Sequence, residues 1–243
     1  MNMKVTKKLL VIGHRGANSI APENSLKAFQ KAIELGADYI EFDVQESKDE
    51  EIVVIHDENT LRTTGHDGEI KEMNLREIKS LDCGEGEKIP TLQELIDLTK
   101  NKINYNCEIK VKGIAPKVVN IFKSANLNKN TIFSSFIHRE LLEIKDLKVK
   151  FQLAALEPTS IGNLKDWNYK KSMIMNASSH EFYAINPLYK LVDQKFVKMA
   201  HDHNLKVFPY TVDSKIAIKK MIKFGVDGII TNDIQKVKEL IES

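Results

Sequence analysis

The sequence predicts an α/β fold, a single TIM-type (β/α)8 barrel that carries a small insertion after its second strand. The chain has 243 residues, close to the roughly 250 residues of such a barrel. Apolar runs of strand length alternate with helical patterns from end to end, which is typical of parallel strands joined by helices. Charged and polar side chains also collect where predicted strands end, and barrel enzymes place their sites at those ends.

Eight strands are predicted from the apolar runs, at 8–13, 38–44, 103–110, 131–135, 149–155, 173–185, 206–212 and 227–231. Helices are predicted at 24–35, 115–125, 138–146, 159–166, 188–203, 214–224 and 233–242. Gly36 and Gly225 support two of the helix ends, because glycine commonly terminates a helix before a following strand.

Residues 45–102 separate the second and third predicted strands by more than one crossover helix. Within this stretch the run from Glu51 to His56 predicts an additional strand, and short helices are expected near 75–80 and 91–100. We interpret the stretch as an insertion on the second βα loop, so that residues 1–243 form one domain.

The charge balance gives little reason to expect nucleic acid or a membrane surface as a partner. There are 36 Lys and Arg against 34 Asp and Glu, a net charge of +2 without a basic stripe. No apolar run reaches the roughly 20 residues of a membrane span. Lys4, Lys7 and Lys8 precede only a short apolar run, unlike a signal peptide. We therefore expect a cytoplasmic protein with a small-molecule partner and no stable membrane insertion, and the oligomeric state is left open.

Three carboxylates are predicted to converge at one end of the barrel. Glu41 and Asp43 lie two residues apart and so project from one face of their strand. Glu108 and Lys110 share a face of the next barrel strand in the same way. Because like charges repel, these side chains predict either a hard divalent cation bound by oxygen ligands or a buried ion-pair network.

Two histidines also follow directly on apolar strands. His14 and Arg15 come after the first strand, and His56 comes after the additional strand of the insertion. Two imidazoles can act as a base and an acid across one bond, since their ordinary pKa lies near neutrality. Arg15 offers a planar group suited to phosphate oxygens. A single histidine at a strand end is more often structural, but the combination favours catalysis.

Short motifs around these residues follow one another in a fixed order. They are His14-Arg15-Gly16, Pro22-Glu23-Asn24-Ser25, Gly36-Ala37-Asp38-Tyr39-Ile40-Glu41-Phe42-Asp43-Val44, Val53-Val54-Ile55-His56-Asp57, Leu61-Arg62-Thr63-Thr64-Gly65, Ile89-Pro90-Thr91-Leu92, Asn106-Cys107-Glu108-Ile109-Lys110, Ser134-Ser135-Phe136, Thr211-Val212-Asp213 and Gly225-Val226-Asp227-Gly228-Ile229-Ile230-Thr231. This series resembles the glycerophosphodiester phosphodiesterase family, in blocks from about residue 9 to residue 235.

The resemblance implies roles for the matching residues. Glu41, Asp43 and Glu108 are similar to the metal ligands of the family, whose usual ion is Ca²⁺ or Mg²⁺. His14 matches the general base and His56 the general acid, although which histidine plays which part is open at this point. The implied activity is metal-dependent hydrolysis of glycerophosphodiesters to sn-glycerol 3-phosphate and an alcohol. Attack on phosphorus would come from the glycerol 2-hydroxyl or directly from water.

Four further side chains are expected to contact the substrate. Arg15 and Lys110 would hold the phosphodiester. Ser135 follows the fourth predicted strand and is expected to line the pocket. Tyr210 stands where the family often has Trp, and it preserves an aromatic wall of smaller area.

Two alternatives remain beside this function. The same fold and chemistry could act on another diester, as a lysophospholipase D or a phosphoinositide-type phosphodiesterase. A non-catalytic phosphodiester-binding barrel is the other alternative, but such a protein would be expected to lack a histidine or a metal carboxylate.

Overall fold

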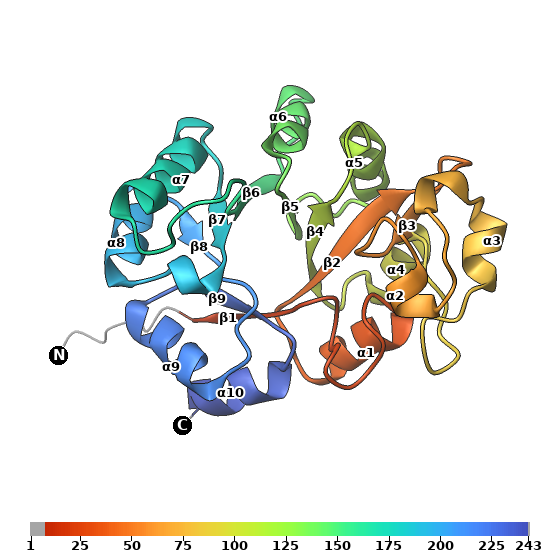
Figure 1. Ribbon diagram of the computed structural model, residues 1–243, viewed down its shortest axis with the longest axis horizontal. Coiled ribbons are helices and arrows are strands. Elements are labelled where there is room, and N and C mark those ends of the chain that lie inside the picture. Colours follow the sequence, from red (N-terminus) through yellow and green to blue (C-terminus); the bar gives the residue numbers. More distant parts are fainter. Residues whose placement is uncertain (1–7, 243) are drawn as a thin grey trace.

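A ring of parallel strands forms the centre of the molecule in the computed structural model, which describes residues 8–242 (Figure 1). Among these residues the ring consists of β1 (Leu10–Gly13), β2 (Tyr39–Glu46), β4 (Asn104–Ile109), β5 (Thr131–Ser135), β6 (Gln152–Glu157), β7 (Ala184–Pro187), β8 (Lys206–Val207) and β9 (Gly228–Thr231). Lys4, Lys7 and the first and last residues of the predicted domain lie outside the described residues.

Helices follow the strands and surround the ring on its outside (Figure 1). They are α1 (Leu26–Glu34), α4 (Leu92–Thr99), α5 (Ala115–Ser124), α6 (His138–Asp146), α7 (Trp167–Ser179), α8 (Gln194–Asp202), α9 (Lys215–Phe224) and α10 (Ile234–Glu242), with the 3-10 helix η2 (Tyr189–Leu191) before α8. The alternation confirms the predicted TIM-type barrel.

The strands pair in the order β8-β7-β6-β5-β4-β2-β1-β9, and every pair in this path is parallel. Between the ends of this path, the backbone N–H of Asp227 donates to the carbonyl of Val207 at 3.0 Å. The N–H of Ile230 donates to the carbonyl of Pro209, also at 3.0 Å. These bonds join β9 to β8 and bring the ring close to closure.

The predicted insertion after the second strand is present. It contains β3 (Ile52–Val54), α2 (Leu61–Thr64), the 3-10 helix η1 (Ile70–Glu72) and α3 (Leu75–Ser80). The strand β3 pairs antiparallel with the end of β2, so it extends the sheet away from the ring. A small apolar cluster of its own fills this part of the molecule, formed by Val53, Ile55, Ile70, Met73, Ile78 and Ile89.

The prediction was wrong between residues 157 and 203. A strand was expected at 173–185 and a helix at 159–166, but the structure has α7 over Trp167–Ser179 and β7 only at Ala184–Pro187. Met173, Ile174 and Ala177 are buried at the spacing of one helical face. The helix predicted at 188–203 is divided into η2 and α8, because Asp193 caps α8 by accepting a hydrogen bond from the N–H of Phe196.

The alternating faces of the strands separate two regions of the core. On β2 the side chains of Ile40, Phe42 and Val44 point outward into the large apolar layer beneath the helices, as predicted. Inside the ring, on the opposite face of the strands, lies a smaller apolar cluster. It consists of Ile12, Ile132, Ala154, Ala184, Phe208 and Ile230.

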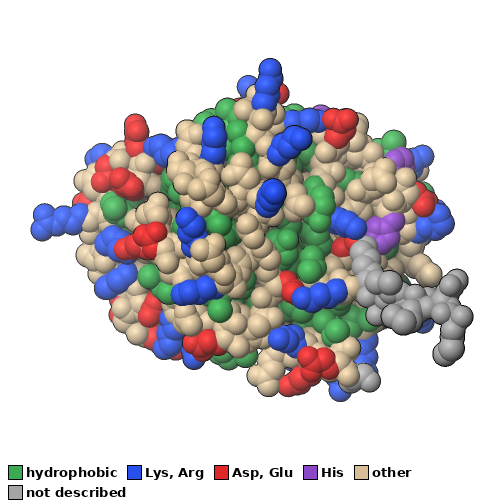
Figure 2. Space-filling model, turned by 180° about the vertical axis from the view of Figure 1, so that it is seen from behind, with side chains coloured by type: hydrophobic (Ala, Val, Ile, Leu, Met, Phe, Trp, Pro, Cys, Tyr) green, Lys and Arg blue, Asp and Glu red, His purple; other side chains and the backbone are tan. Residues whose placement is uncertain are grey.

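The surface carries charges of both signs. Figure 2 shows Lys and Arg side chains interspersed with Asp and Glu over the face seen from behind the view of Figure 1. Among the described residues, no helix combines the length and the apolar composition that crossing a membrane would require.

Phe42 ties the strand that carries two of the predicted site residues to the outer core. Its ring is fully buried and makes edge contacts with Phe29 at 5.9 Å and Tyr105 at 6.4 Å between ring centroids. We expect Phe42→Ala to lower the free energy of unfolding by about 3–5 kcal/mol, because it leaves a cavity. Chemical denaturation would measure the loss. Ile216→Ala is the control, since Ile216 is 71% exposed. A loss no larger than that of the control would contradict this account.

Candidate active site

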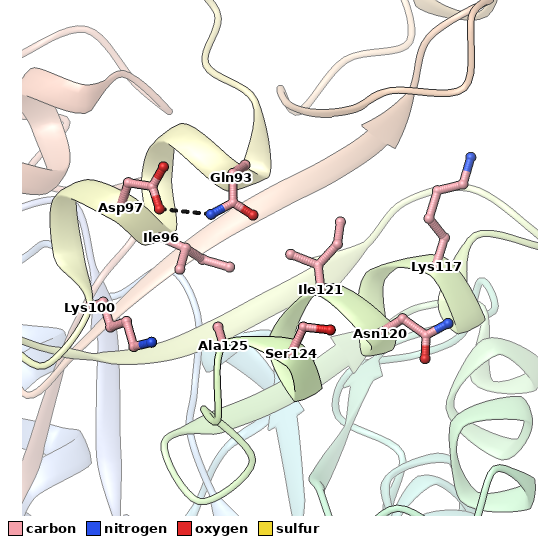
Figure 3. A pocket seen from close by; sticks show the side chains of 9 residues that line it. All are labelled: Gln93, Ile96, Asp97, Lys100, Lys117, Asn120, Ile121, Ser124 and Ala125. Carbon is pink, nitrogen blue, oxygen red and sulfur yellow. Dashed lines mark hydrogen bonds between the residues drawn. The ribbon is translucent and has the colours of Figure 1, made fainter.

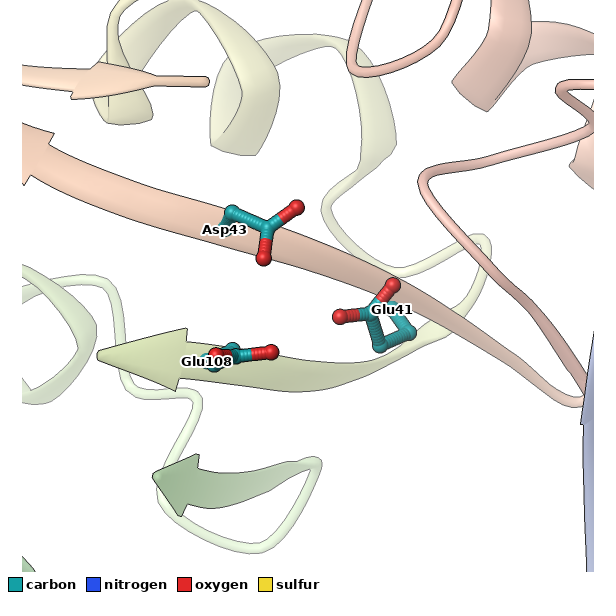
Figure 4. A group of neighbouring side chains, drawn as sticks. All are labelled: Glu41, Asp43 and Glu108. Atoms are coloured by element: carbon teal, nitrogen blue, oxygen red, sulfur yellow. The ribbon is translucent and has the colours of Figure 1, made fainter. Parts of the chain in front are cut away.

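Three carboxylates converge inside the barrel between β2 and β4. Glu41 and Asp43 extend from β2, and Glu108 extends from β4, where its backbone pairs with that of Asp43. One oxygen from each carboxylate lies within 4.8 Å of the other two. Figure 4 shows the three groups turned toward one another. The strand alternation seen in the sequence therefore produces one acidic cluster.

The acidic cluster is buried and repels itself. Burial and the charges of Asp43 and Glu108 raise the pKa of Glu41 well above its usual value. Burial and the charge of Asp43 likewise raise the pKa of Glu108 to about 7. The Oδ1 atom of Asp43 is buried without a hydrogen-bond partner. Such a donor set fits a hard divalent cation, because the ion would coordinate the free oxygen and relieve the repulsion.

Two cationic side chains flank the acidic cluster. The Nζ atom of Lys110 lies 2.8 Å from Glu108 Oε1 and 3.7 Å from Asp43 Oδ1. The backbone N–H of Arg15 donates to Glu41 at 2.8 Å, while its Nε atom lies 3.5 Å from Asp43 Oδ2. Burial alone would lower the pKa of Lys110, but Glu108 and Asp43 raise it, so the ammonium group stays charged.

A close approach of backbone segments positions Arg15 and His14. Gly16 has a φ of +83°, and a Cβ atom added to it would lie 2.7 Å from the backbone of Ala28 in α1. Because another residue would clash there, the loop after β1 can lie tightly against α1 only with glycine. This packing directs the loop toward the acidic cluster.

His14 is oriented by a chain of two hydrogen bonds. Its Nδ1 atom lies 2.6 Å from Asn232 Oδ1, and Asn232 Nδ2 donates to Asp213 at 2.7 Å. Because the carboxylate can only accept, the amide oxygen must face the ring, and Nδ1 carries the proton. Nε2 is then free to accept one. Burial and the charge of Arg15 lower the pKa of His14 from its ordinary value, which favours the neutral ring.

His56 has a carboxylate as its partner. Its Nδ1 atom lies 2.5 Å from Asp57 Oδ1. Burial alone would raise the pKa of Asp57, but the hydrogen bonds from Arg62 and His56 lower it to about 2. Arg62 also binds Glu23, which in turn binds Arg15 at 2.8 Å. The two histidine loops are therefore joined through one ionic network.

Both histidines and two members of the acidic cluster, Glu41 and Glu108, line one cavity of about 200 Å³. Tyr210 forms part of its wall and makes an edge contact with Phe136 at 5.9 Å between ring centroids. The residues lining the cavity are His14, Arg15, Glu41, His56, Asn106, Glu108, Ser134, Phe136, Leu156, Tyr210, Thr211 and Ile230. The cavity thus brings together two imidazoles, two carboxylates, a guanidinium group and an apolar wall.

Three predicted site residues do not line this cavity: Asp43 and Lys110, which lie beside it in and against the acidic cluster, and Ser135. The hydroxyl of Ser135 donates to the carbonyl of Ile109 at 2.7 Å and accepts the N–H of Ile137 at 2.9 Å. Its neighbour Ser134 lines the cavity instead, because successive strand residues point to opposite faces. Lys110 stands beside the cavity through its contact with Glu108.

Three residues that orient the histidines, directly or through a neighbour, received no role from the sequence. Asp57 is adjacent to His56, so its position was a usable signal. Asn232 and Asp213 follow the last two strands of the ring, but Asn232 is 218 residues from His14. Only the closure of the ring brings these residues together.

A larger hollow of about 770 Å³ lies elsewhere, on the outside of the barrel between α4 and α5 (Figure 3). Its wall is formed by helical surface residues, and its carboxylate Asp97 accepts a hydrogen bond from Gln93 at 2.7 Å. No histidine lines this hollow. The chemistry-bearing residues converge at the smaller cavity, so we place the candidate active site there.

The chain is similar to known proteins of one family. The model of the glycerophosphoryl diester phosphodiesterase family matches residues 14–236. A glycerophosphodiester phosphodiesterase of Caldanaerobacter subterraneus subsp. tengcongensis is 39% identical over 247 residues, covering 96% of this chain and 98% of the relative.

Two solved structures have the same fold. A phosphodiesterase from Oleispira antarctica, in complex with the product sn-glycerol-3-phosphate, superimposes with a TM-score of 0.85 at 27% identity over 96% of this chain and 97% of that chain. A glycerophosphodiester phosphodiesterase from Thermotoga maritima gives a TM-score of 0.81 at 29% identity over 96% and 98% of the two chains. From its sequence and its fold, the chain belongs to the glycerophosphoryl diester phosphodiesterase family.

Proposed function

We propose that the protein hydrolyses glycerophosphodiesters to sn-glycerol 3-phosphate and an alcohol in a metal-dependent reaction. The observation that carries the proposal is the convergence of the acidic cluster, two histidines and two cationic side chains in and directly beside one cavity. The bound product in the Oleispira antarctica structure supports the same substrate class. The cytoplasmic location and a single domain over residues 1–243 stay predictions.

Glu41, Asp43 and Glu108 would hold the metal ion, for which Ca²⁺ and Mg²⁺ are the two candidates. Both ions prefer oxygen ligands, and the unpartnered Oδ1 atom of Asp43 is available to one. When bound, the ion supplies Lewis-acid stabilisation of negative charge on the phosphoryl oxygens.

Arg15 and Lys110 would bind the phosphodiester. Both lie against the acidic cluster, so an anion bound between them would also be close to the metal ligands. Their charges would favour the additional negative charge that develops on the phosphoryl oxygens during attack.

His14 would act as the general base. Its neutral ring presents a free Nε2 atom because Asn232 accepts the Nδ1 proton. Nε2 would remove a proton from the attacking hydroxyl, either the glycerol 2-hydroxyl or water. His56 would act as the general acid and protonate the departing alcohol. The carboxylate of Asp57 contacts its Nδ1 atom and so orients the ring, leaving Nε2 to face the departing oxygen.

The direct test is release of glycerol 3-phosphate from glycerophosphocholine, glycerophosphoethanolamine and glycerophosphoglycerol. The reaction would be followed with Mg²⁺, with Ca²⁺ and with a chelator. We expect release that requires the metal. Folded, metal-loaded protein that releases product from none of these diesters would contradict the proposal, and turnover of lysophospholipids alone would favour the alternative substrate class.

Removal of either imidazole tests the acid–base roles. His14→Ala and His56→Ala should each lower kcat by about 10²–10⁴-fold, the usual contribution of a positioned acid or base. Circular dichroism would confirm that each variant is folded. His66→Ala is the matched control, because His66 is exposed and does not line the cavity. Turnover near that of the control in either variant would remove that histidine from the mechanism.

The raised carboxyl pKa values predict how metal stabilisation depends on pH. Glu108 has a pKa of about 7 against an ordinary value of 4.5, so in this range the folded metal-free protein holds a proton that the unfolded chain releases. The free energy of unfolding of the metal-free protein should therefore fall as pH rises through that window. A saturating divalent cation should raise Tm more at about pH 8 than at about pH 5, since protons compete with the ion.

Scanning calorimetry with and without Mg²⁺ or Ca²⁺ would measure this difference. The double variant Glu41→Gln/Glu108→Gln is the control and should show little metal-induced change in Tm at either pH. An equal increase in Tm at both pH values in the parent protein would contradict a metal site made of these carboxylates.

A further inference from the structure

Two buried side chains in the wall of the cavity have polar atoms without partners. Asn106 is 0% exposed and Ser134 is 1% exposed. Neither the Nδ2 and Oδ1 atoms of Asn106 nor the Oγ atom of Ser134 has a hydrogen-bond partner. Buried polar atoms in folded proteins are nearly always hydrogen-bonded, so three unpartnered atoms beside one cavity call for a ligand.

The strand register places both residues next to the acidic cluster. Asn106 lies two residues before Glu108 on β4 and therefore shares its face. Ser134 pairs directly with Glu108 across β4 and β5. Two residues earlier on β5, Ile132 belongs to the apolar cluster inside the ring. Asn106 in turn pairs directly with Glu41 across β2 and β4, so both uncharged side chains lie beside a carboxylate of the acidic cluster.

The rest of the cavity wall limits what the ligand can be. Phe136, Leu156 and Ile230 contribute apolar surface to the same cavity. A fitting ligand group is therefore short and uncharged, with hydroxyls to bond and carbon atoms to pack. The amide of Asn106 can donate to one hydroxyl and accept from a second, while the hydroxyl of Ser134 can do either.

We propose that Asn106 and Ser134 form a hydroxyl-recognition subsite that binds the vicinal diol of the glycerol group. The inference rests on the proposed function and adds the residues that would select a glycerol diester over a diester without hydroxyls. The phosphate would lie beside Arg15 and Lys110, and the glycerol group would extend from it toward β4 and β5. Selectivity of this kind is strong because a substrate without hydroxyls leaves the buried polar atoms unpaired.

Asn186 provides a matched control at another inward-facing position of the barrel. It lies on β7 two residues after Ala184, which belongs to the apolar cluster inside the ring. Asn186 is also 0% exposed, and both of its amide atoms lack a partner. Unlike Asn106, it does not line the cavity. Replacing Asn106 by Leu therefore removes a side chain that a ligand in the cavity can reach, whereas replacing Asn186 by Leu does not.

The experiment compares two diesters that differ only in the terminal hydroxyl, glycerophosphoethanolamine and 2-hydroxypropyl phosphoethanolamine. Both keep the 2-hydroxyl, one of the two candidate attacking groups, so both can react by either route. The ratio of their kcat/KM values would be measured for the parent protein, Asn106→Leu, Ser134→Ala and Asn186→Leu. We expect the parent to prefer the glycerol diester. The preference should fall about tenfold in Ser134→Ala and up to about a hundredfold in Asn106→Leu, in proportion to the bonds lost. Asn186→Leu should retain it.

A structural role would give a different result. Because the polar atoms of Asn106 and Ser134 bond to no protein group, neither substitution should lower the free energy of unfolding of the ligand-free protein, as chemical denaturation would measure. The Asn106→Leu variant could lose turnover of both diesters because the larger side chain disturbs the metal ligands. In that case the substrate preference of Ser134→Ala tests whether the subsite exists. A preference that stays within about twofold of the parent in Ser134→Ala would overturn the inference.

The failure of this subsite can be distinguished from failure of the proposed function. A parent protein that hydrolyses both diesters equally would keep the phosphodiesterase activity and exclude the subsite. A parent that hydrolyses neither would exclude the proposed function. In that case calorimetric binding of sn-glycerol 3-phosphate against n-propyl phosphate would still test the subsite, and equal affinities would overturn it.

Discussion

Repulsion among three buried carboxylates is the constraint on which the rest of the site depends. Glu41, Asp43 and Glu108 lie on adjacent strands, and burial strengthens the interaction between their charges. Arg15 and Lys110 lie beside the cluster and offset part of this charge. One Asp43 oxygen still has no hydrogen-bond partner. A divalent cation would neutralise the remaining negative charge of the carboxylates. The phosphodiester would then bind among the cation, Arg15 and Lys110, which are all positively charged.

The interior of the barrel combines apolar, uncharged polar and charged side chains. One inner cluster is apolar, while the uncharged Asn106 and Ser134 lie in register with Glu41 and Glu108. Strand alternation links this arrangement to stability, because Phe42 anchors β2 in the outer core between the inward-facing Glu41 and Asp43. The same strand therefore serves the core on one face and the site on the other.

The sequence was most informative where strand periodicity decides the outcome. Alternation placed Glu41 and Asp43 on one face, and the common direction of parallel strands brought Glu108 to them. The prediction failed where a shift of one residue along a strand changes the face on which a side chain lies. Ser134 lines the cavity, and Ser135 does not. Asn232 could not be predicted as the hydrogen-bond partner of His14, because only the closure of the ring brings the first and last strands together. In α7, polar residues obscured the helical spacing of its buried side chains.

The measurement that tests the account most directly is anomalous diffraction from crystals soaked with Mn²⁺, a redox-stable substitute for Mg²⁺ that also prefers oxygen ligands. The account predicts one anomalous peak among Glu41, Asp43 and Glu108, within about 2.0–2.6 Å of an oxygen of each. No peak at this position, with Lys110 and Arg15 alone neutralising the carboxylates, would show that the cluster is an ion-pair network and would contradict the metal-dependent mechanism.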